Sequence, residues 1–340
     1  MDDVITLAHG AGGTVMGKLI KETILPSFFL RRALEGIGLD DLDDGASLKL
    51  RDHEIVVSLD SHTVSPLFFP GGDIGRLALA GTVNDVAVMG AKPIAVLDAV
   101  IVEEGFPISD LKRVLSSMNR AAREVPVAII GGDIKVMRRG ELDQMVIATC
   151  GIGIAERGRV VSDAGARPGD RVIISGTIGD HGIALMATRE GLQMETAVKS
   201  DINPIWDVVE AALKVGGITA MKDPTRGGVS SALNEIAEKS SVSVWIDEGE
   251  IPVRDGVKAA SEVLGIDPLE VTCEGKAVIT VDGGRADDVV EAIRQTRHGR
   301  DARIIGEVRA TYPGYVLMRT AVGGTRIIQK PVGEPIPRVC

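Results

Sequence analysis

The chain has 340 residues, of which 44% are hydrophobic and 41 are glycine, so it is long enough for two globular domains and is neither disordered nor fibrous. Its net charge of −10 and its 3% aromatic content argue against a surface that binds nucleic acid or anionic membranes. Three cysteines form no disulfide framework and suit a reducing, cytoplasmic location. The acidic start Met1-Asp2-Asp3 lacks the basic segment of a signal peptide. The apolar stretch 86–102 contains Lys92 and Asp98, so we do not expect it to span a membrane.

The first half of the chain alternates helical and strand patterns. Apolar spacing predicts helices at about 14–25, 74–89 and 110–124, and strands at 54–60, 94–102 and 145–155. A further apolar run, 127–130, leads directly into Gly131-Gly132-Asp133. The segment 157–170 is rich in Gly, Ala and charged residues, and we predict that it separates two halves of the chain.

The second half begins again with a strand at 171–175 and a polar turn at 176–182. Helices are predicted near 204–215, 228–239 and 286–296, and strands near 243–247, 277–281, 303–307 and 316–319. Both halves therefore mix strands with helices and are similar in size.

Acidic residues in the first half occur where predicted strands or turns end. They are Asp43, Asp44, Asp60, Asp85 and Asp133. A carboxylate on a mostly apolar element is costly to bury unless it is paired or coordinated, and Asp85 interrupts an otherwise apolar helical pattern. Each acid alone could equally be a helix cap or a turn residue. Together, with few Lys or Arg nearby, they favour a site where Mg²⁺ bridges nucleotide phosphates.

Glycine-rich turns precede three predicted helices. They are 9–13 (His-Gly-Ala-Gly-Gly), 71–73 (Gly-Gly-Asp) and 223–228 (Asp-Pro-Thr-Arg-Gly-Gly). Glycine lets backbone N–H groups approach an anion, and a helix N-terminus adds its dipole. The sequence contains no Walker A motif and no strand-linked G-x-G-x-x-G, so a nucleotide site would be neither a P-loop nor a Rossmann site.

The chain ends in a cysteine, Cys340, after a segment that contains Pro331, Pro335 and Pro337. These prolines favour an extended spacer, of which roughly ten residues reach about 30–35 Å, so the terminal thiol could act as a swinging carrier. A frayed tail that happens to end in Cys is the alternative, and the tail by itself favours it. Prenylation would need the cysteine four residues from the end.

Together these segments resemble the HypE family of hydrogenase maturation proteins, the carbamoyl dehydratases of the aminoimidazole-ribonucleotide-synthetase-like (PurM-like) ATP-binding superfamily. The resemblance runs nearly end to end. It is carried by residues 9–13, 42–46, 58–91, 131–137, 175–186, 221–229 and 274–276 and by the terminal Pro-Arg-Val-Cys. The pieces 84–91 and 131–133 are shared across the superfamily and imply ATP binding, whereas the terminal cysteine motif distinguishes this family from kinases and synthetases.

The resemblance implies a reaction on the terminal thiol. A partner carbamoyltransferase would load a carbamoyl group onto Cys340, and ATP would drive its dehydration from S-carboxamide to S-cyanate. The cyano group would pass to iron on a scaffold complex of two further maturation proteins, as a cyanide ligand of [NiFe]-hydrogenase. Because an amide oxygen is a poor leaving group, this chemistry needs phosphoryl transfer, charge neutralisation and a base.

The same resemblance implies roles for individual residues. Glu274 and Asp85 are the candidate bases, and Lys135 would orient a phosphate or the carboxamide oxygen. Without the resemblance, Glu274 would be interpreted as a surface acid and Lys135 as a solvated lysine. The implied ligands of Mg²⁺ are Asp43, Asp44, Asp60, Asp85 and Asp133. The implied ATP contacts are His9, Gly10, Gly12, Gly13, Asp60, Asn84, Gly131, Gly132, Thr225, Arg226, Gly227 and Gly228.

Two positions depart from the family pattern. Ile134 follows Asp133 where Thr is more often expected, and Cys273 precedes Glu274 where a small polar residue is expected. Cys273 is predicted to be either a packed thiol or a nucleophile beside the site. The α-carboxylate of Cys340 disfavours its thiolate, so we expect a thiol loaded by a partner rather than one that activates itself.

The implied architecture is an α+β, two-domain PurM-like fold that forms a homodimer through its first sheet. The predicted division is a glycine-loop and helix segment (1–40), an ATP- and Mg-binding dimerisation domain (41–156), a C-terminal domain (157–329) and a flexible carrier tail (330–340). Two rival functions remain. A small-molecule kinase of the same superfamily would share the acids but not need Cys340, and a non-enzymatic scaffold would use the tail only for docking.

Overall fold

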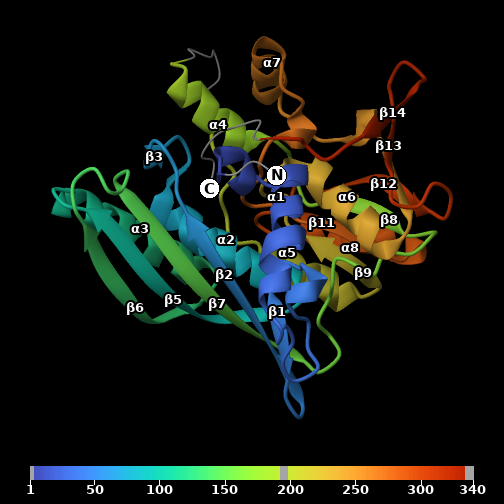
Figure 1. Ribbon diagram of the computed structural model, residues 1–340. Coiled ribbons are helices and arrows are strands. Elements are labelled where there is room, and N and C mark those ends of the chain that lie inside the picture. Colours follow the sequence, from blue (N-terminus) through green and yellow to red (C-terminus); the bar gives the residue numbers. More distant parts are fainter. Residues whose placement is uncertain (1–3, 192–197, 334–340) are drawn as a thin grey trace.

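The computed structural model describes residues 4–191 and 198–333. It contains two sheets with helices around them (Figure 1). Cys340 and the rest of the predicted tail beyond residue 333 lie outside the described residues. Within the described part of the chain, no helix has the length and apolar character that crossing a membrane requires.

The first sheet has five strands in the order β1-β2-β7-β5-β6. Their bounds are β1 Ala46–Lys49, β2 His53–His62, β5 Lys92–Glu103, β6 Ala128–Met137 and β7 Met145–Glu156. In the described part of this sheet, β5 and β6 are the one parallel pair, and the helix α3 (Ile108–Glu124) makes the crossover that such a pair needs. The short strands β3 (Phe68–Phe69) and β4 (Gly72–Asp73) form a separate hairpin.

Helix α2 (Ile74–Val88) lies against one face of this sheet and is buried along its whole length. It begins at Asp73, whose carboxylate accepts hydrogen bonds from the N–H groups of Gly75 (2.9 Å) and Arg76 (3.1 Å). A helix that is apolar on all sides must be buried on all sides. Ile74 accordingly packs with Ile183 and Val257 of the second half, which places α2 between the two halves.

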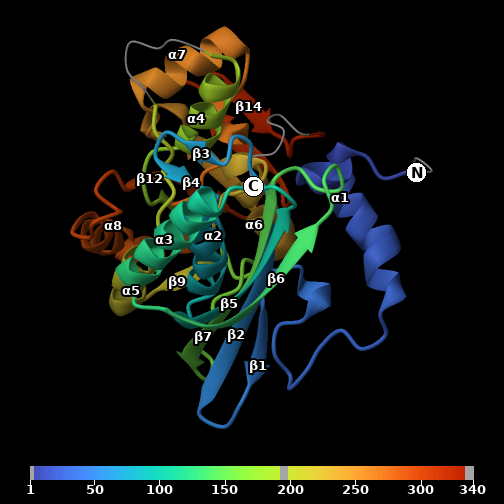
Figure 2. The ribbon, with the colours of Figure 1, turned by 90° about the vertical axis from the view of Figure 1, so that its left-hand side faces the viewer.

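Among residues 4–191 and 198–333, no helix packs on the opposite face of the first sheet (Figure 2). The N-terminal segment lies on this side: helix α1 (Gly13–Leu19) continues through one π turn (Ile20–Ile24) and a 3-10 turn (Leu25–Ser27). This agrees with the predicted helix at 14–25. None of the residues of α1 is buried, and Phe29 just beyond it is almost fully exposed.

The second sheet has seven strands in the order β14-β13-β10-β12-β8-β11-β9. Their bounds are β8 Arg171–Ile174, β9 Ile218–Lys222, β10 Ser243–Asp247, β11 Val278–Val281, β12 Arg303–Arg309, β13 Val316–Arg319 and β14 Thr325–Ile328. Helix α6 (Gly228–Ser240) covers one face, whereas α5 (Trp206–Val215) and α8 (Ala286–Arg294) cover the other. Helices α4 (Asp180–Arg189) and α7 (Asp255–Leu264) pack against each other beside α2.

Several predicted elements are confirmed within a few residues, and others are wrong. The predicted turn at 176–182 contains the start of helix α4. Gly131-Gly132-Asp133 does not follow a strand but lies in the middle of β6. Strands β1 and β9 and helix α7 were not predicted. At the start of α4, a local hydrogen bond partly offsets the burial of a polar residue that resembles a turn in the sequence: Asp180 Oδ2 accepts from the hydroxyl of Thr177 at 2.6 Å.

Candidate active site

Carboxylates from both halves of the chain come together beside α2, and all except the partly exposed Asp60 have nearly buried side chains. Asp44 precedes β1, Asp60 lies on β2 and Asp85 on α2, while Asp223 follows β9 and Glu274 precedes β11. Ser58 of β2 donates a 2.6 Å hydrogen bond to Asp85. The structure thus brings together Asp44, Asp60, Asp85 and Glu274, which the sequence had singled out, with Asp223, which it had not.

Mutual repulsion marks this carboxylate cluster, defined as Asp44, Asp60, Asp85, Asp223 and Glu274. Burial raises the pKa of Asp85 well above its ordinary value, and the charges of Asp223, Asp60 and Asp44 raise it further. Burial, followed by the charges of Asp223, Asp201 and Asp60, does the same to the pKa of Glu274. Burial raises the pKa of Asp223 to about 6, although Lys222 acts in the opposite direction. The cluster therefore has more negative charge than its own protein neighbours neutralise.

Lys222 supplies the nearest buried positive charge. Its ammonium forms an ion pair with Asp44 and also lies 3.4 Å from Asp163 and 3.2 Å from Glu235. Sequence reasoning missed Lys222 and Asp163, as well as Asp223. The charged pair Lys222-Asp223 could have indicated this part of the site. Its position at the end of a strand was not recognised, because β9 (Ile218–Lys222) was not predicted.

Three carboxylate oxygens of the cluster are left without a donor among the described residues. Asp44 Oδ2, Asp223 Oδ2 and Glu274 Oε1 are buried without a hydrogen-bond partner. No group of three or more His, Cys, Asp or Glu residues among 4–191 and 198–333 is arranged to hold a metal ion by itself. In nucleotide-binding sites, substrate phosphates commonly complete the coordination of Mg²⁺.

The predicted glycine loop lies against the turn before α6. A Cβ atom on Gly12 would lie 2.9 Å from Cβ of Arg226, and a Cβ on Gly13 would collide with the carbonyl oxygen of Pro331. Both glycines have positive φ angles, of 80° and 69°, so other residues would also be strained there. Thr14 N–H donates to Pro331 O at 3.2 Å.

The turn at 225–228 completes this arrangement. Gly228 N–H donates to Thr225 O at 2.9 Å, and Gly227, at the start of α6, faces the ring of Pro331. The base of the tail therefore lies between two glycine turns. Arg226 lies 4.0 Å from Asp60 and so connects these turns to the carboxylate cluster. His9 is turned toward its own loop, with Nδ1 2.9 Å from the hydroxyl of Thr6.

Two predicted site residues, Asn84 and Asp43, have hydrogen-bond partners within the chain. The side-chain amide of Asn84 donates to Asn203 O at 3.0 Å and accepts from Ile205 N–H at 2.9 Å, so it joins α2 to the second half of the chain. Asp43 accepts from Asp44 N–H at 3.0 Å and from Asp163 N–H at 3.4 Å. The roles of Asn84 as a nucleotide contact and of Asp43 as a metal ligand stay predictions.

Asp133 and Lys135 are not near the cluster within one chain. Asp60 is in register with Thr149 and Asp98, and the side chains of this row lie on the face of the sheet that α2 covers. Asp133 belongs to the next row, in register with Ala99 and Ala148. Side chains alternate between faces along a strand, so Asp133 and Lys135 project from the opposite, uncovered face of the sheet. They lie on β6, at the edge of the sheet, and are exposed together with Gly131 and Gly132.

Cys273 is a packed thiol. It is buried, its sulfur accepts a hydrogen bond from Gly179 N–H at 3.3 Å, and burial raises its pKa well above the ordinary value. A thiol that resists ionisation is a poor nucleophile. Of the two interpretations of Cys273, the geometry therefore favours packing.

Comparisons with known proteins agree with this architecture. Residues 42–155 match the N-terminal domain of AIR synthase related proteins, and residues 167–317 match the C-terminal domain. A putative hydrogenase expression/formation protein of Methanocaldococcus jannaschii is 48% identical, with 99% of both chains covered. The carbamoyl dehydratase HypE of Azotobacter vinelandii is 44% identical, with 99% of this chain and 97% of that protein covered.

Solved structures give the same result. The crystal structure of a HypE–HypF complex matches 92% of this chain and 99% of that chain with a TM-score of 0.86 and 43% identity. A hydrogenase maturation protein HypE in complex with ATP matches 99% of this chain and 100% of that chain with a TM-score of 0.82 and 41% identity. The two-domain PurM-like fold is thus confirmed, and the chain belongs to the HypE family of hydrogenase maturation proteins.

Proposed function

We propose that this protein is an ATP-dependent carbamoyl dehydratase that converts an S-carboxamide on its own Cys340 into an S-cyanate. The cyano group would become a cyanide ligand of the iron centre of [NiFe]-hydrogenase. The observation that carries the proposal is the base of the tail, Pro331, which lies between two glycine turns beside a cluster of unneutralised carboxylates. From Pro331, nine residues reach up to about 30 Å.

Asp44, Asp60 and Asp85 of the predicted set would hold Mg²⁺, together with Asp223, which that set did not include. Mg-ATP, when bound, supplies the phosphoryl group that turns the carboxamide oxygen into a leaving group. The net change is loss of the carboxamide oxygen as phosphate and of both amide protons, which leaves a C≡N group on sulfur. The glycine turns at 9–13 and 225–228, with Arg226, would bind the phosphates.

Glu274 is the better of the two candidate bases. Asp85 already accepts a hydrogen bond from Ser58, whereas Glu274 Oε1 is buried without a partner. Burial, followed by the charges of neighbouring carboxylates, raises the pKa of Glu274, which makes its carboxylate a stronger base than that of a solvated glutamate. Removing water from such a site also protects the reactive intermediate.

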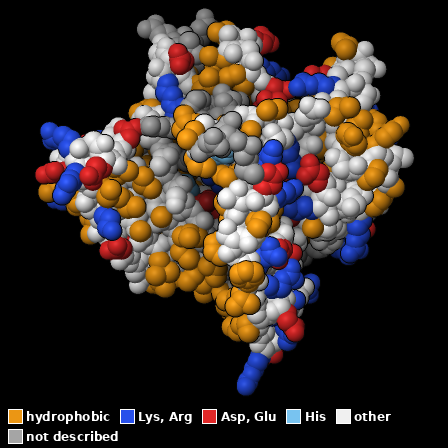
Figure 3. Space-filling view, viewed as in Figure 1, with side chains coloured by type: hydrophobic (Ala, Val, Ile, Leu, Met, Phe, Trp, Pro, Cys, Tyr) orange, Lys and Arg blue, Asp and Glu red, His pale blue; other side chains and the backbone are white. Residues whose placement is uncertain are grey.

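A homodimer would place the remaining predicted residues at an active site. The uncovered face of the first sheet carries apolar side chains such as Leu59 and Leu97, and hydrophobic side chains gather below the centre of the space-filling view (Figure 3). Pairing of two such faces would bury this surface. Asp133, Lys135 and the glycines at 131–132 would then serve an active site across the interface rather than within one chain.

The partners follow from the same proposal. The solved HypE–HypF complex supports a carbamoyltransferase partner that loads Cys340. The cyanated tail would then meet an iron-binding scaffold complex of two further maturation proteins, in the cytoplasm.

The decisive experiment measures the mass of the C-terminal peptide after reaction with the carbamoyltransferase partner, carbamoyl phosphate and ATP. We expect Cys340 to gain one carbamoyl group and then to lose one water when Mg-ATP is added. Glu274→Gln should accept the carbamoyl group but dehydrate it about 10²–10⁴-fold more slowly, as for loss of a general base. A tail that stays unmodified while the partner is active, together with ATP turnover that survives removal of Cys340, would support the kinase alternative instead.

A further inference from the structure

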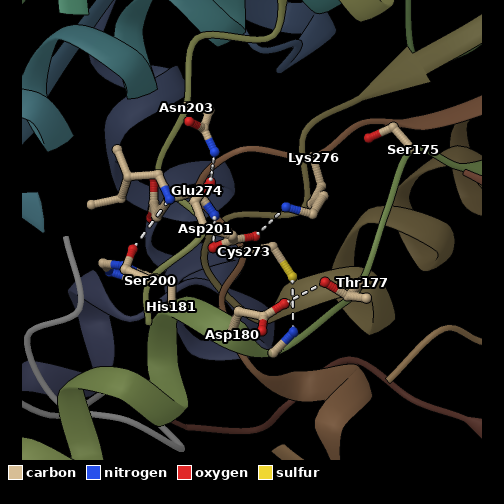
Figure 4. A network of polar contacts seen from close by, with 12 residues as sticks. Ser175, Thr177, Asp180, His181, Ser200, Asp201, Asn203, Cys273, Glu274 and Lys276 are labelled. Atoms are coloured by element: carbon tan, nitrogen blue, oxygen red, sulfur yellow. Dashed lines mark hydrogen bonds and ion pairs between the residues drawn. The ribbon is translucent and has the colours of Figure 1, made fainter. Parts of the chain in front are cut away.

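A second polar network lies directly behind Glu274 and has no part in the chemistry proposed above (Figure 4). Asp201, from the segment before α5, and Lys276, just before β11, form its centre: Lys276 Nζ lies 2.9 Å from Asp201 Oδ2. The other carboxylate oxygen, Asp201 Oδ1, accepts a hydrogen bond from the backbone N–H of Glu274 at 3.2 Å. One carboxylate oxygen of Asp201 thus binds Lys276, and the other binds the backbone of Glu274.

The backbone of Glu274 is held on both sides. Its carbonyl oxygen accepts hydrogen bonds from Asn203 N–H and from the side-chain amide of Asn84, both at 3.4 Å. The next residue, Gly275, faces the carbonyl oxygen of Asp201 so closely that a Cβ atom would collide with it. Glu274 therefore has a fixed main chain, while its carboxyl oxygen Oε1 has no partner.

The Asp201–Lys276 pair is buried and charged. The side chains are 4% and 8% exposed. Burial raises the pKa of Asp201, but Lys276 and His181 more than offset it, so that the pKa lies below the ordinary value. The pKa of Lys276 is raised because Asp201 outweighs the effect of burial. Asp180 and Cys273 are the other titratable groups that face this lysine.

Stability alone is a weak reason for such a pair, because a buried ion pair can often be replaced by neutral groups without loss. Its particular feature here is the hydrogen bond to the amide of the proposed base. We propose that Asp201 and Lys276 are positioning residues for Glu274: Lys276 orients the Asp201 carboxylate, which fixes the main chain from which the Glu274 carboxyl reaches the substrate. This inference rests on the proposed function.

Two double variants separate positioning from simple charge pairing. Asp201→Asn/Lys276→Gln removes both charges but keeps an oxygen that accepts from Glu274 N–H. Asp201→Ala/Lys276→Gln removes that oxygen as well. The two double variants therefore differ mainly in whether residue 201 can accept the hydrogen bond from Glu274 N–H. Dehydration of carbamoylated Cys340 is followed by peptide mass, the KM for ATP is measured alongside, and hydrogen exchange reports on the Glu274 amide.

We expect the Asn/Gln variant to stay within about threefold of wild type and the Ala/Gln variant to lose about 10–100-fold in kcat, with an unchanged KM for ATP, as for misplacement of a reacting group. The Glu274 amide should exchange faster in the Ala/Gln variant only. Equal kcat values, or a KM that rises in step with the loss of rate, would overturn the positioning role. If the Ala/Gln variant does not fold, the hydrogen-exchange rate of the Glu274 amide in wild type tests the inference. An amide that exchanges as fast as a surface amide would overturn it. Wild type that is carbamoylated but never dehydrated would instead refute the proposed function.

Discussion

At the scale of single residues, Asp223 shows how strongly the site depends on neighbours from distant parts of the chain. Its carboxyl is buried beside Asp60 and Lys222, and burial is the main reason why its pKa rises to about 6. In the sequence it is one more acid before a proline. Only the fold, by placing it next to carboxylates of the first half, makes it part of a charged cluster.

The raised pKa of Asp223 predicts how stability depends on pH. The folded-state pKa of about 6 exceeds the unfolded value of 3.8, so this residue's stabilising contribution is complete below pH 4 and is lost as the pH rises through 6. We expect Asp223→Asn to stabilise the metal-free protein by at most about 3 kcal/mol at pH 8, and by less at pH 5. Melting temperatures at both pH values, with a chelator present, measure the difference.

Mg-ATP should act against this difference in stability between wild type and Asp223→Asn. Because a bound cation offsets the carboxylates, wild type is expected to gain more in melting temperature from Mg-ATP than Asp223→Asn does. A variant that is less stable than wild type at pH 8, or equally stabilised at both pH values, would contradict this account of Asp223.

At the scale of elements, the glycine loop and helix α1 connect the nucleotide-binding turns to the tail. The main contacts are Gly13 against the carbonyl of Pro331 and the hydrogen bond from Thr14 N–H to the same oxygen. Helix α1 contributes no buried residue, so these contacts, rather than a core, hold its start in place.

A pair of substitutions in α1 tests this connection. A methyl group on Gly13 would collide with Pro331, so Gly13→Ala is expected to speed amide exchange at Thr14 and to slow dehydration by about tenfold. Gly17 has open space and lies inside the helix, so Gly17→Ala should stabilise α1 by up to about 1 kcal/mol and leave the rate unchanged. Equal rates in the two variants would show that the contact with Pro331 has no catalytic role.

The position of Gly131-Gly132-Asp133 within a strand was not predicted, because the constraint that places these residues there comes from a neighbouring strand. Gly131 and Gly132 have low strand propensity, but they lie in β6 because neighbouring β5 pairs with them. Gly132 faces the carboxyl of Asp98 so closely that no side chain would fit there. Such constraints come from the adjacent strand and leave no periodic pattern in the chain itself.

At the scale of the whole molecule, the uncovered face of the first sheet exposes apolar side chains such as Leu59 and Leu97. Leu59, Cys150 and Leu97 lie in one row across β2, β7 and β5 on this face. Apolar rows of this kind normally pack against another layer. The strand β6 at its edge also has unpaired backbone groups, which favour pairing with another chain.

The dimer can be tested through this row. Leu59 is 71% exposed, so Leu59→Glu should leave one chain intact but place charges in the interface, and the mass in solution should fall from twice 35.8 kDa to that of one chain. Val322, 96% exposed in the turn after β13, provides a matched control whose change to Glu should have no effect. Light scattering after gel filtration measures both. Wild type that is already monomeric would refute the dimer.

The sequence by itself determined the family, the two-domain fold and the residue types of the site, because contiguous motifs such as 84–91 and 221–229 carry that information. It also predicted Asp44, Asp60 and Asp85 as candidates, since acids that end or interrupt apolar elements are conspicuous, whereas Glu274 was predicted through the family resemblance alone. Only the tertiary structure decided which candidates meet. It added Asp223, Lys222 and the Asp201–Lys276 pair, engaged Asn84 in a structural contact and placed Asp133 on the opposite face of the sheet. The reason is physical: burial and the distance between charges depend on which strands become neighbours, and strand pairing joins segments far apart in the chain.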